Sequence, residues 1–111
     1  MHVTLDIAAS GPAVVRIAGR LDLLSAGEVK ERLAQAVADG HRRLVVDLQD
    51  VIFLDSSGLG ALISGLKAAR VAGGDLRLAR AGEQVQLVLR LTTLDRVLRP
   101  YPSVEEALVG Y

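Results

Sequence analysis

A buried strand, a polar turn and a helix follow one another directly in residues 45–60, and this run constrains the fold more than any other. Val45-Val46-Asp47-Leu48 predicts an apolar strand, and Asp55-Ser56-Ser57 predicts a turn that opens into a helix. The first amides of a helix have no backbone partner and carry a partial positive charge, so a serine at this point can be exposed and can carry a phosphate without unravelling the helix. The run therefore suggests a phosphorylation switch.

Strands and helices alternate along the rest of the chain. Near the start, apolar residues alternate with polar ones, as in a hairpin of two strands. In later segments the spacing of the apolar residues changes between that of a strand and that of a helix. This alternation is typical of an α/β fold with crossover connections, so we expect a single domain over residues 1–111 with a mixed β-sheet and the order β-β-α-β-α-β-α-β-α. The expected elements are strands at 3–7 and 13–18, a helix from 25 to 39, a strand at 43–48 at the centre of the sheet, a helix at 57–72, a strand at 76–80, a helix at 83–91, a short strand at 96–99 and a last helix after residue 103.

Local signals mark the starts of two helices. Ser25 and Glu28 have the spacing of a capping box, which predicts a helix start at Ser25. Leu24 and Val29 occupy the positions of a hydrophobic staple across that start. The capping-box spacing recurs at residues 103–106, ahead of the last helix.

Three glycines, Gly58, Gly60 and Gly65, lie in the helix expected at 57–72. Each costs helix stability, roughly 1 kcal/mol relative to alanine at an interior position, so a close approach of the sheet or of a partner should compensate. Together with Leu59, the first two glycines would form a smooth patch on which another protein could dock closely.

Composition excludes several classes of function. Thirteen basic residues balance thirteen acidic ones among 111, so no net field draws the chain to nucleic acid or to an anionic membrane. The arginines at 77, 80, 90, 96 and 99 are interpreted as part of solvent-exposed faces and not as the lining of a groove that binds nucleic acid. No cysteine is present, and the two histidines are interpreted as surface residues, so no metal site and no cofactor are expected. We also expect no signal peptide and no membrane-spanning helix, and therefore a cytoplasmic protein.

Enzyme motifs are missing around the two serines. A nucleophilic serine needs a base, and the Gly-x-Ser-x-Gly elbow is absent because Asp55 precedes Ser56 and Ser57. No phosphate-binding loop or dinucleotide fingerprint occurs either. The serines could also serve as plain N-caps, since Asp and Ser are the preferred residues there. The roles can be divided, with Asp55 or Ser57 capping the helix while Ser56 accepts phosphate.

The segment Phe53-Leu54-Asp55-Ser56-Ser57-Gly58-Leu59-Gly60 resembles the phosphorylation signature of anti-sigma factor antagonists, the bacterial members of the STAS domain family. Gly19-Arg20-Leu21-Asp22 is similar to the family's Gly-Glu-Leu-Asp turn, with Arg20 where the family often has glutamate. The resemblance covers essentially the whole chain. It implies that Ser56 is phosphorylated by a partner that is both a serine kinase and an anti-sigma factor.

The same resemblance implies a regulatory binding protein rather than an enzyme. The unphosphorylated form would bind the anti-sigma kinase and release a sigma factor, phosphorylation of Ser56 would end that binding, and a separate phosphatase would restore it. An alternative is a non-switching STAS module in a stress-signalling scaffold or a membrane transport assembly. Neither interpretation fixes whether the domain forms a homodimer. The residues expected to contact the partner are Asp22, Asp55, Ser57, Gly58, Leu59 and Gly60.

Overall fold

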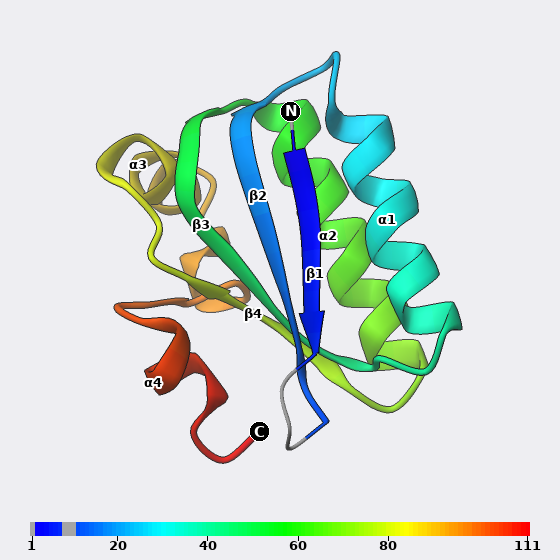
Figure 1. Ribbon diagram of the computed structural model, residues 1–111. Helices are drawn as coiled ribbons and strands as arrows, with labels where there is room; N and C mark the ends of the chain where they lie inside the picture. Colours follow the sequence, from blue (N-terminus) through cyan, green and yellow to red (C-terminus); the bar gives the residue numbers. More distant parts are fainter. Residues whose placement is uncertain (1, 8–10) are drawn as a thin grey trace.

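A mixed five-stranded sheet in the order β1-β2-β3-β4-β5 organises the molecule (Figure 1). A computed structural model describes residues 2–7 and 11–111, with only the backbone described at 5–7. β1 is antiparallel to β2, and the other neighbouring strands are parallel. The predicted order of strands and helices is confirmed, with a short 3-10 helix added. The elements are β1 (His2–Ile7), β2 (Ala13–Leu21), α1 (Ala26–Ala38), β3 (Arg43–Leu54), α2 (Ser56–Val71), β4 (Asp75–Ala79), α3 (Glu83–Leu91), η1 (Leu94–Arg96), β5 (Pro100–Tyr101) and α4 (Val104–Leu108).

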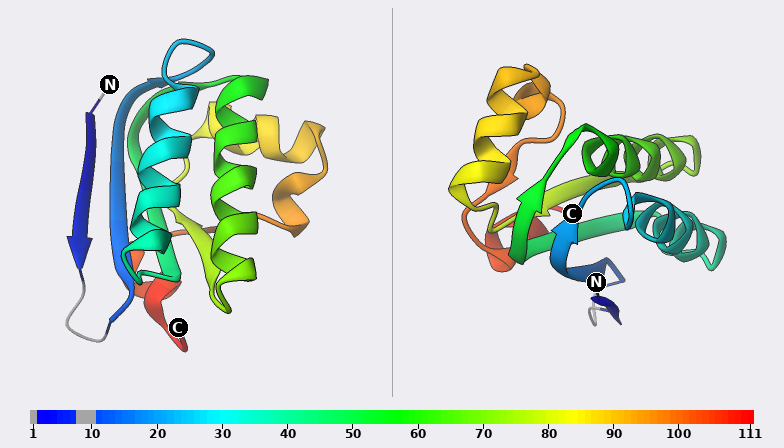
Figure 2. Two further views of the ribbon diagram at one scale, coloured as in Figure 1. Left: turned by 90° about the vertical axis from the view of Figure 1, so that its right-hand side faces the viewer. Right: turned by 90° about the horizontal axis from the view of Figure 1, so that it is seen from above.

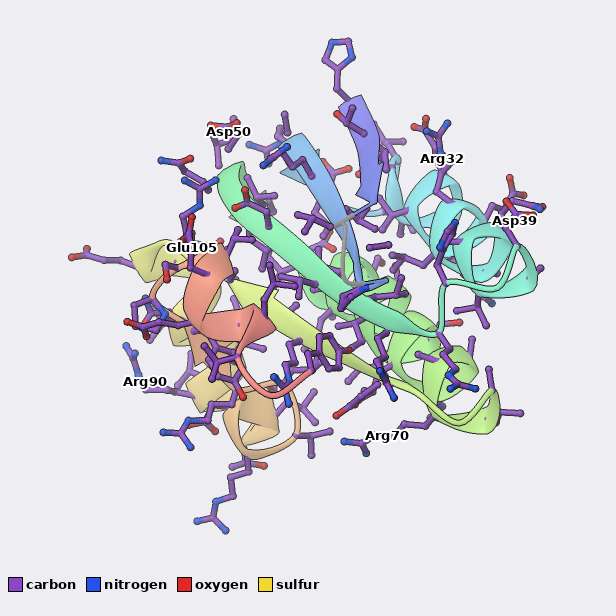
Figure 3. All side chains as sticks on the ribbon, turned by 60° about the horizontal axis from the view of Figure 1, so that its bottom comes forward. Arg32, Asp39, Asp50, Arg70, Arg90 and Glu105 are labelled. Carbon is purple, nitrogen blue, oxygen red and sulfur yellow. The ribbon has the colours of Figure 1, made fainter. Side chains whose placement is uncertain are left out.

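The helices cover the two faces of the sheet unequally. α1 and α2 lie side by side on one face, α3 lies beside β3, and the short α4 packs on the opposite face (Figure 2). The larger apolar cluster fills the space between the sheet and α1, α2 and α3, and a smaller one lies under α4. Charged side chains such as Arg32 of α1, Asp39 at the end of α1 and Arg90 of α3 lie on the outside of the molecule (Figure 3).

β3 is the central strand, as the sequence predicts, and it is covered on both faces. Leu44 and Val46 belong to the larger cluster, whereas Val45 belongs to the cluster under α4. The strand is longer than expected, because pairing with β2 continues through two irregularities in register as far as Leu54. β4 pairs only with residues 43–47, so the second half of β3 has α3 beside it instead of a strand.

The side chain of Gln84 in α3 completes the hydrogen bonding of that second half. Its amide nitrogen donates to the Leu54 carbonyl oxygen at 2.8 Å, and its amide oxygen accepts from the Leu54 backbone nitrogen at 2.8 Å. Leu54 is 1% exposed, so these backbone groups would otherwise lack a partner away from water. Gln84 therefore holds the end of β3 immediately before the turn that contains the two serines.

Two local expectations are wrong. Ser25 is the N-cap of α1, as its predicted start requires, but Leu24 is 95% exposed, so no hydrophobic staple forms with Val29. The expected strand at 96–99 is also displaced, since Arg96 ends the 3-10 helix and the paired residues are Pro100 and Tyr101. A proline can occupy the first position of an edge strand because no ladder hydrogen bond is required from its nitrogen.

Candidate functional site

The turns that follow β2 and β3 meet at one end of the sheet. Leu21 pairs with Leu54 in the ladder, and the Asp55 backbone nitrogen donates to the Leu21 carbonyl oxygen at 3.3 Å. One carboxylate oxygen of Asp55 accepts from the backbone nitrogen of Leu23 at 3.2 Å. The structure thus brings the turn of Asp22 against the start of α2, although the two are more than thirty residues apart in the sequence.

Asp55 is the N-cap of α2. Its second carboxylate oxygen accepts from the Gly58 backbone nitrogen at 2.9 Å, which is the bond that an N-cap side chain makes to the third residue of a helix. Of the two capping possibilities left by the sequence, Asp55 is therefore correct and Ser57 is not. Because one carboxylate binds both turns, the start of α2 and the segment after β2 are held in a fixed relation.

Ser56 is the first residue of α2, and its side chain is exposed. Within the described part of the chain, no group forms a hydrogen bond with its hydroxyl. Ser57 is half-buried and, among the same residues, its hydroxyl has no hydrogen-bond partner. Since Asp55 already caps the helix, the hydroxyl of Ser56 is not needed to hold the fold and is accessible to another molecule.

Asp22 organises the neighbouring turn. One of its carboxylate oxygens accepts from the Leu24 backbone nitrogen at 3.1 Å, and the other lies 3.4 Å from the guanidinium of Arg20. Ser25 binds back to this turn, because its hydroxyl donates to the Arg20 carbonyl oxygen at 2.6 Å and accepts from the Asp22 backbone nitrogen at 3.0 Å. Ser25 therefore does not form the predicted side-chain cap of α1.

The prediction that Gly58, Leu59 and Gly60 form an exposed docking patch is wrong in part. Gly58 is buried, and a Cβ built on it would lie 2.1 Å from the carbonyl oxygen of Leu21. Leu59 is 4% exposed and belongs to the main core. Of the three residues only Gly60 is exposed, so the other two hold α2 against the sheet and do not form a surface for a partner.

Exposed apolar residues near the two turns were missed from the sequence. Leu23 and Leu24 are 74% and 95% exposed, and Ile52 near the end of β3 is 72% exposed. Phe53 is half-buried, and the guanidinium of Arg20 lies 4.4 Å from the centre of its ring. Two consecutive leucines in an otherwise polar turn were the available signal, because such residues are usually found in the core.

Asp47 is a buried charge on the sheet face that carries α4. Its side chain is 3% exposed and accepts from the Arg80 guanidinium through both carboxylate oxygens, with one Nε–Oδ1 distance of 3.0 Å. Arg16 lies 3.5 Å away, and the Gln49 backbone nitrogen donates at 3.2 Å. Burial raises the pKa of Asp47, but the hydrogen bonds and the two arginines lower it more, so the pKa lies below its usual value.

Two arginines interpreted as solvated are instead part of the fold. Arg80 adopts a left-handed backbone conformation with φ of 56°, and its pair with Asp47 anchors it there. Arg77 donates to the carbonyl oxygens of Ala107 and Val109 and lies 4.2 Å from the centre of the Tyr111 ring. Neither side chain belongs to the turns around Ser56, so both act on the fold rather than on that site.

Two other kinds of feature are absent from the part of the chain that the structure describes. Over residues 2–7 and 11–111, no group of three or more His, Cys, Asp or Glu side chains is placed to hold a metal ion. In the same part of the chain, no helix is long and apolar enough to cross a membrane.

Comparison with known proteins agrees with this architecture. The anti-sigma-F factor antagonist RsfB of Mycobacterium tuberculosis is 31% identical over 103 residues, which are 91% of this chain and 82% of RsfB. Relatives from Thermotoga neapolitana and Thermotoga maritima are 36% identical over 69 residues, and the match spans 61% of their length and 62% of this chain. The crystal structure of an anti-sigma factor antagonist from Mycobacterium paratuberculosis superposes with a TM-score of 0.87 at 28% identity, covering 98% of this chain and 92% of that one. The family model for the STAS domain matches residues 5–107, and the chain therefore belongs to the STAS domain family.

Proposed function

We propose that this protein is an anti-sigma factor antagonist that is switched by phosphorylation of Ser56. The observation that carries the proposal is the state of Ser56, which is exposed at the first position of α2 with its hydroxyl unbonded in the described structure. Two relatives from Mycobacterium are named anti-sigma factor antagonists, which supports this role for the protein. In its unphosphorylated form the protein binds an anti-sigma factor that is also a serine kinase, and a sigma factor is released.

A phosphate on Ser56 changes the charge of the surface more than the stability of the fold. It adds about −1.5 to −2 charges at neutral pH, next to the carboxylates of Asp55 and Asp22. The positive end of α2 offsets part of this, typically about 0.3–1 kcal/mol for an exposed anion. Because the cap of α2 is provided by Asp55, the helix start survives, and the added charge acts mainly on the partner through repulsion and desolvation.

The partner-binding surface in this proposal surrounds Ser56. It includes Asp22, Asp55, Ser57 and Gly60, and the exposed Leu23 and Leu24 add apolar area to it. ATP belongs to the kinase, and the domain itself is a substrate and a binding protein rather than an enzyme. A separate phosphatase removes the phosphate, and residues 1–111 act as one STAS domain in the cytoplasm, with no direct contact to nucleic acid or membrane.

The test is intact-mass measurement after incubation with the anti-sigma kinase of the same organism and ATP. We expect one phosphate on the wild-type chain and on Ser57→Ala, and none on Ser56→Ala. Isothermal titration should then show that the kinase binds the unmodified chain and that Ser56→Asp binds at least about tenfold more weakly, which corresponds to about 1.4 kcal/mol. Modification of Ser57 alone would contradict the site, and unmodified chain that binds the kinase constitutively would identify a non-switching STAS module.

A further inference from the structure

Two side chains clamp the backbone of β3, one near each end of the strand. At one end, the amide of Gln84 donates to the Leu54 carbonyl oxygen and accepts from the Leu54 nitrogen, both at 2.8 Å. At the other end, the hydroxyl of Tyr111 accepts from the Leu44 nitrogen at 3.0 Å and donates to the Leu44 carbonyl oxygen at 2.9 Å. The two clamps make the same kind of contact, but only the one from Gln84 lies beside the turn of Ser56.

The peptide group between Leu54 and Asp55 is held from both sides. Its carbonyl oxygen accepts from Gln84 of α3, and its nitrogen donates to the Leu21 carbonyl oxygen at 3.3 Å. β4 pairs only with residues 43–47 of β3, so no strand in the described part of the chain pairs with the α3 side of Leu54, and Gln84 takes that place. The backbone at the start of α2 is therefore fixed by α3 as well as by β2.

Ser56 depends on this backbone for its position, since its side chain is exposed and no group in the described part of the chain forms a hydrogen bond with its hydroxyl. In phosphorylation, the hydroxyl oxygen forms a bond to the terminal phosphorus of ATP, the bond from that phosphorus to ADP breaks, and the hydroxyl proton passes to a base of the kinase. The oxygen must lie about 3–3.5 Å from the phosphorus, and a misplacement of about 1 Å can lower the rate about a hundredfold. We propose, on the basis of the proposed function, that Gln84 is a positioning residue for the phosphorylation of Ser56.

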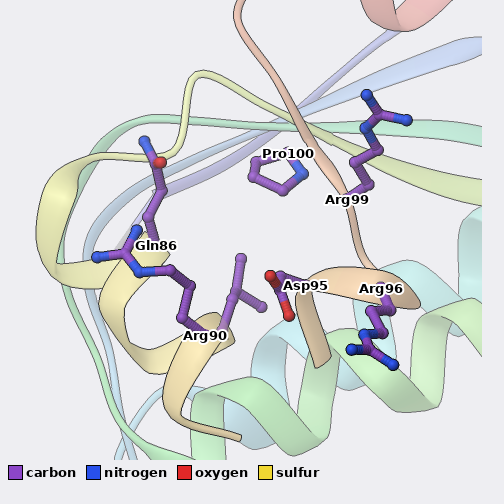
Figure 4. Close-up of a pocket in the computed structure, with 7 residues that line it drawn as sticks. Gln86, Arg90, Asp95, Arg96, Arg99 and Pro100 are labelled. Carbon is purple, nitrogen blue, oxygen red and sulfur yellow. The ribbon is translucent and has the colours of Figure 1, made fainter. Parts of the chain in front are cut away.

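Gln86 and Tyr111 provide matched controls. Like Gln84, Gln86 is a half-buried glutamine of α3, but its side chain donates to the Ala81 carbonyl oxygen at 2.7 Å. It lines a hollow between α3 and the start of β5 (Figure 4). Gln86→Met therefore controls for the loss of a half-buried amide, and Tyr111→Phe controls for the loss of a clamp on β3 that does not touch the turn of Ser56.

The test is single-turnover phosphorylation of the full chain by excess anti-sigma kinase of the same organism and ATP, at a temperature where circular dichroism shows every variant folded. We expect Gln84→Met to lower the maximal rate at least about fivefold and to change the half-saturating kinase concentration less than about twofold, because the exposed surface keeps its residues. Gln84→Asn is one methylene group shorter and cannot reach both backbone groups of Leu54, so it should lower the maximal rate at least about threefold. For Gln86→Met and Tyr111→Phe, the maximal rate should stay within about twofold of the wild type.

Amide hydrogen exchange measures the positioning without the kinase. In Gln84→Met the backbone amide of Leu54 should exchange at least about tenfold faster relative to that of Leu44, and Tyr111→Phe should reverse this order. An unchanged maximal rate for Gln84→Met, an equal loss of rate in Tyr111→Phe, or unchanged exchange of Leu54 would overturn the proposal. A wild-type chain that receives no phosphate on Ser56 would instead contradict the proposed function itself, and would overturn the positioning role together with it.

Discussion

Gly58 and Gly60 lie two residues apart in α2, and alanine at each should change stability in opposite directions. A Cβ at position 58 would lie 2.1 Å from the Leu21 carbonyl oxygen and 2.8 Å from its carbonyl carbon, so backbone would have to move. Forcing extra atoms into a packed site costs about 1–3 kcal/mol. The displaced Leu21 carbonyl oxygen also accepts from the Asp55 backbone nitrogen, and losing that bond adds about 1 kcal/mol.

Gly60 is the matched control. A Cβ there meets nothing within 4 Å, and the residue is exposed. Alanine should stabilise the helix by about 0.5–1 kcal/mol, because glycine in a helix loses more backbone entropy on folding. We therefore expect Gly58→Ala to lower the free energy of unfolding by about 2–4 kcal/mol and Gly60→Ala to raise it slightly.

Urea unfolding followed by circular dichroism measures both effects, since the chain has no tryptophan for fluorescence. At about 4–8 °C per kcal/mol for a domain of this size, Gly58→Ala should also lower the melting temperature by roughly 10 °C or more. A Gly58→Ala variant as stable as the wild type would show that α2 does not lie this close to the end of β2. The same change in sign and size at both positions would refute the argument from close approach.

Three other substitutions test separate parts of the structure. Asp55→Ala removes the acceptor for both Gly58 and Leu23 and should cost about 1–2 kcal/mol in urea unfolding, whereas Asp55→Asn, which keeps one amide oxygen, should cost less. Asp47→Asn should destabilise the protein at neutral pH by about 1–3 kcal/mol because Arg80 loses its charged partner. Since the pKa of Asp47 is lower in the folded protein than in the unfolded chain, this advantage of the wild type is complete above the unfolded pKa and is lost as the pH falls through the folded pKa. Tyr111→Phe removes a hydroxyl that accepts from the Leu44 nitrogen at 3.0 Å and donates to the Leu44 carbonyl oxygen at 2.9 Å, and it should cost about 1–2 kcal/mol in the same assay; equal stability of this variant would mean that the segment after α4 does not anchor on the sheet.

The sequence predicts the local features of the site well because they depend on neighbours. Asp55 and Ser56 lie at the junction of an apolar strand and a helical period, and capping preferences alone place a cap there. The helix at 83–91 is confirmed at both ends for the same reason, since its apolar period stops at Leu91. By contrast, Leu24 and Val29 have the spacing of a staple, but the turn that Ser25 and Asp22 form carries Leu24 into solvent.

Features that join distant segments could not be predicted. Nothing near Gln84 indicates that its amide will bind the backbone of Leu54, which is thirty residues earlier. The extension of β3 to Leu54 also depends on a register with β2 that includes two irregularities. Likewise, Arg90 and Arg99 come to line one hollow only because α3 and the segment after η1 pack together, which a charge pattern along the chain does not reveal.

In the proposed switch, phosphorylation of Ser56 would leave the fold intact because a different residue caps α2. If Ser56 itself capped α2, its hydroxyl would accept from a backbone nitrogen, and phosphorylation would have to break that bond. Asp55 instead provides the cap with one oxygen and binds the turn after β2 with the other. The same carboxylate therefore leaves Ser56 free and fixes its position next to Leu23 and Leu24. In the proposed complex, a partner that covers these leucines would lie against the hydroxyl of Ser56, so a phosphate on Ser56 would weaken the partner's binding before it disturbs the helix.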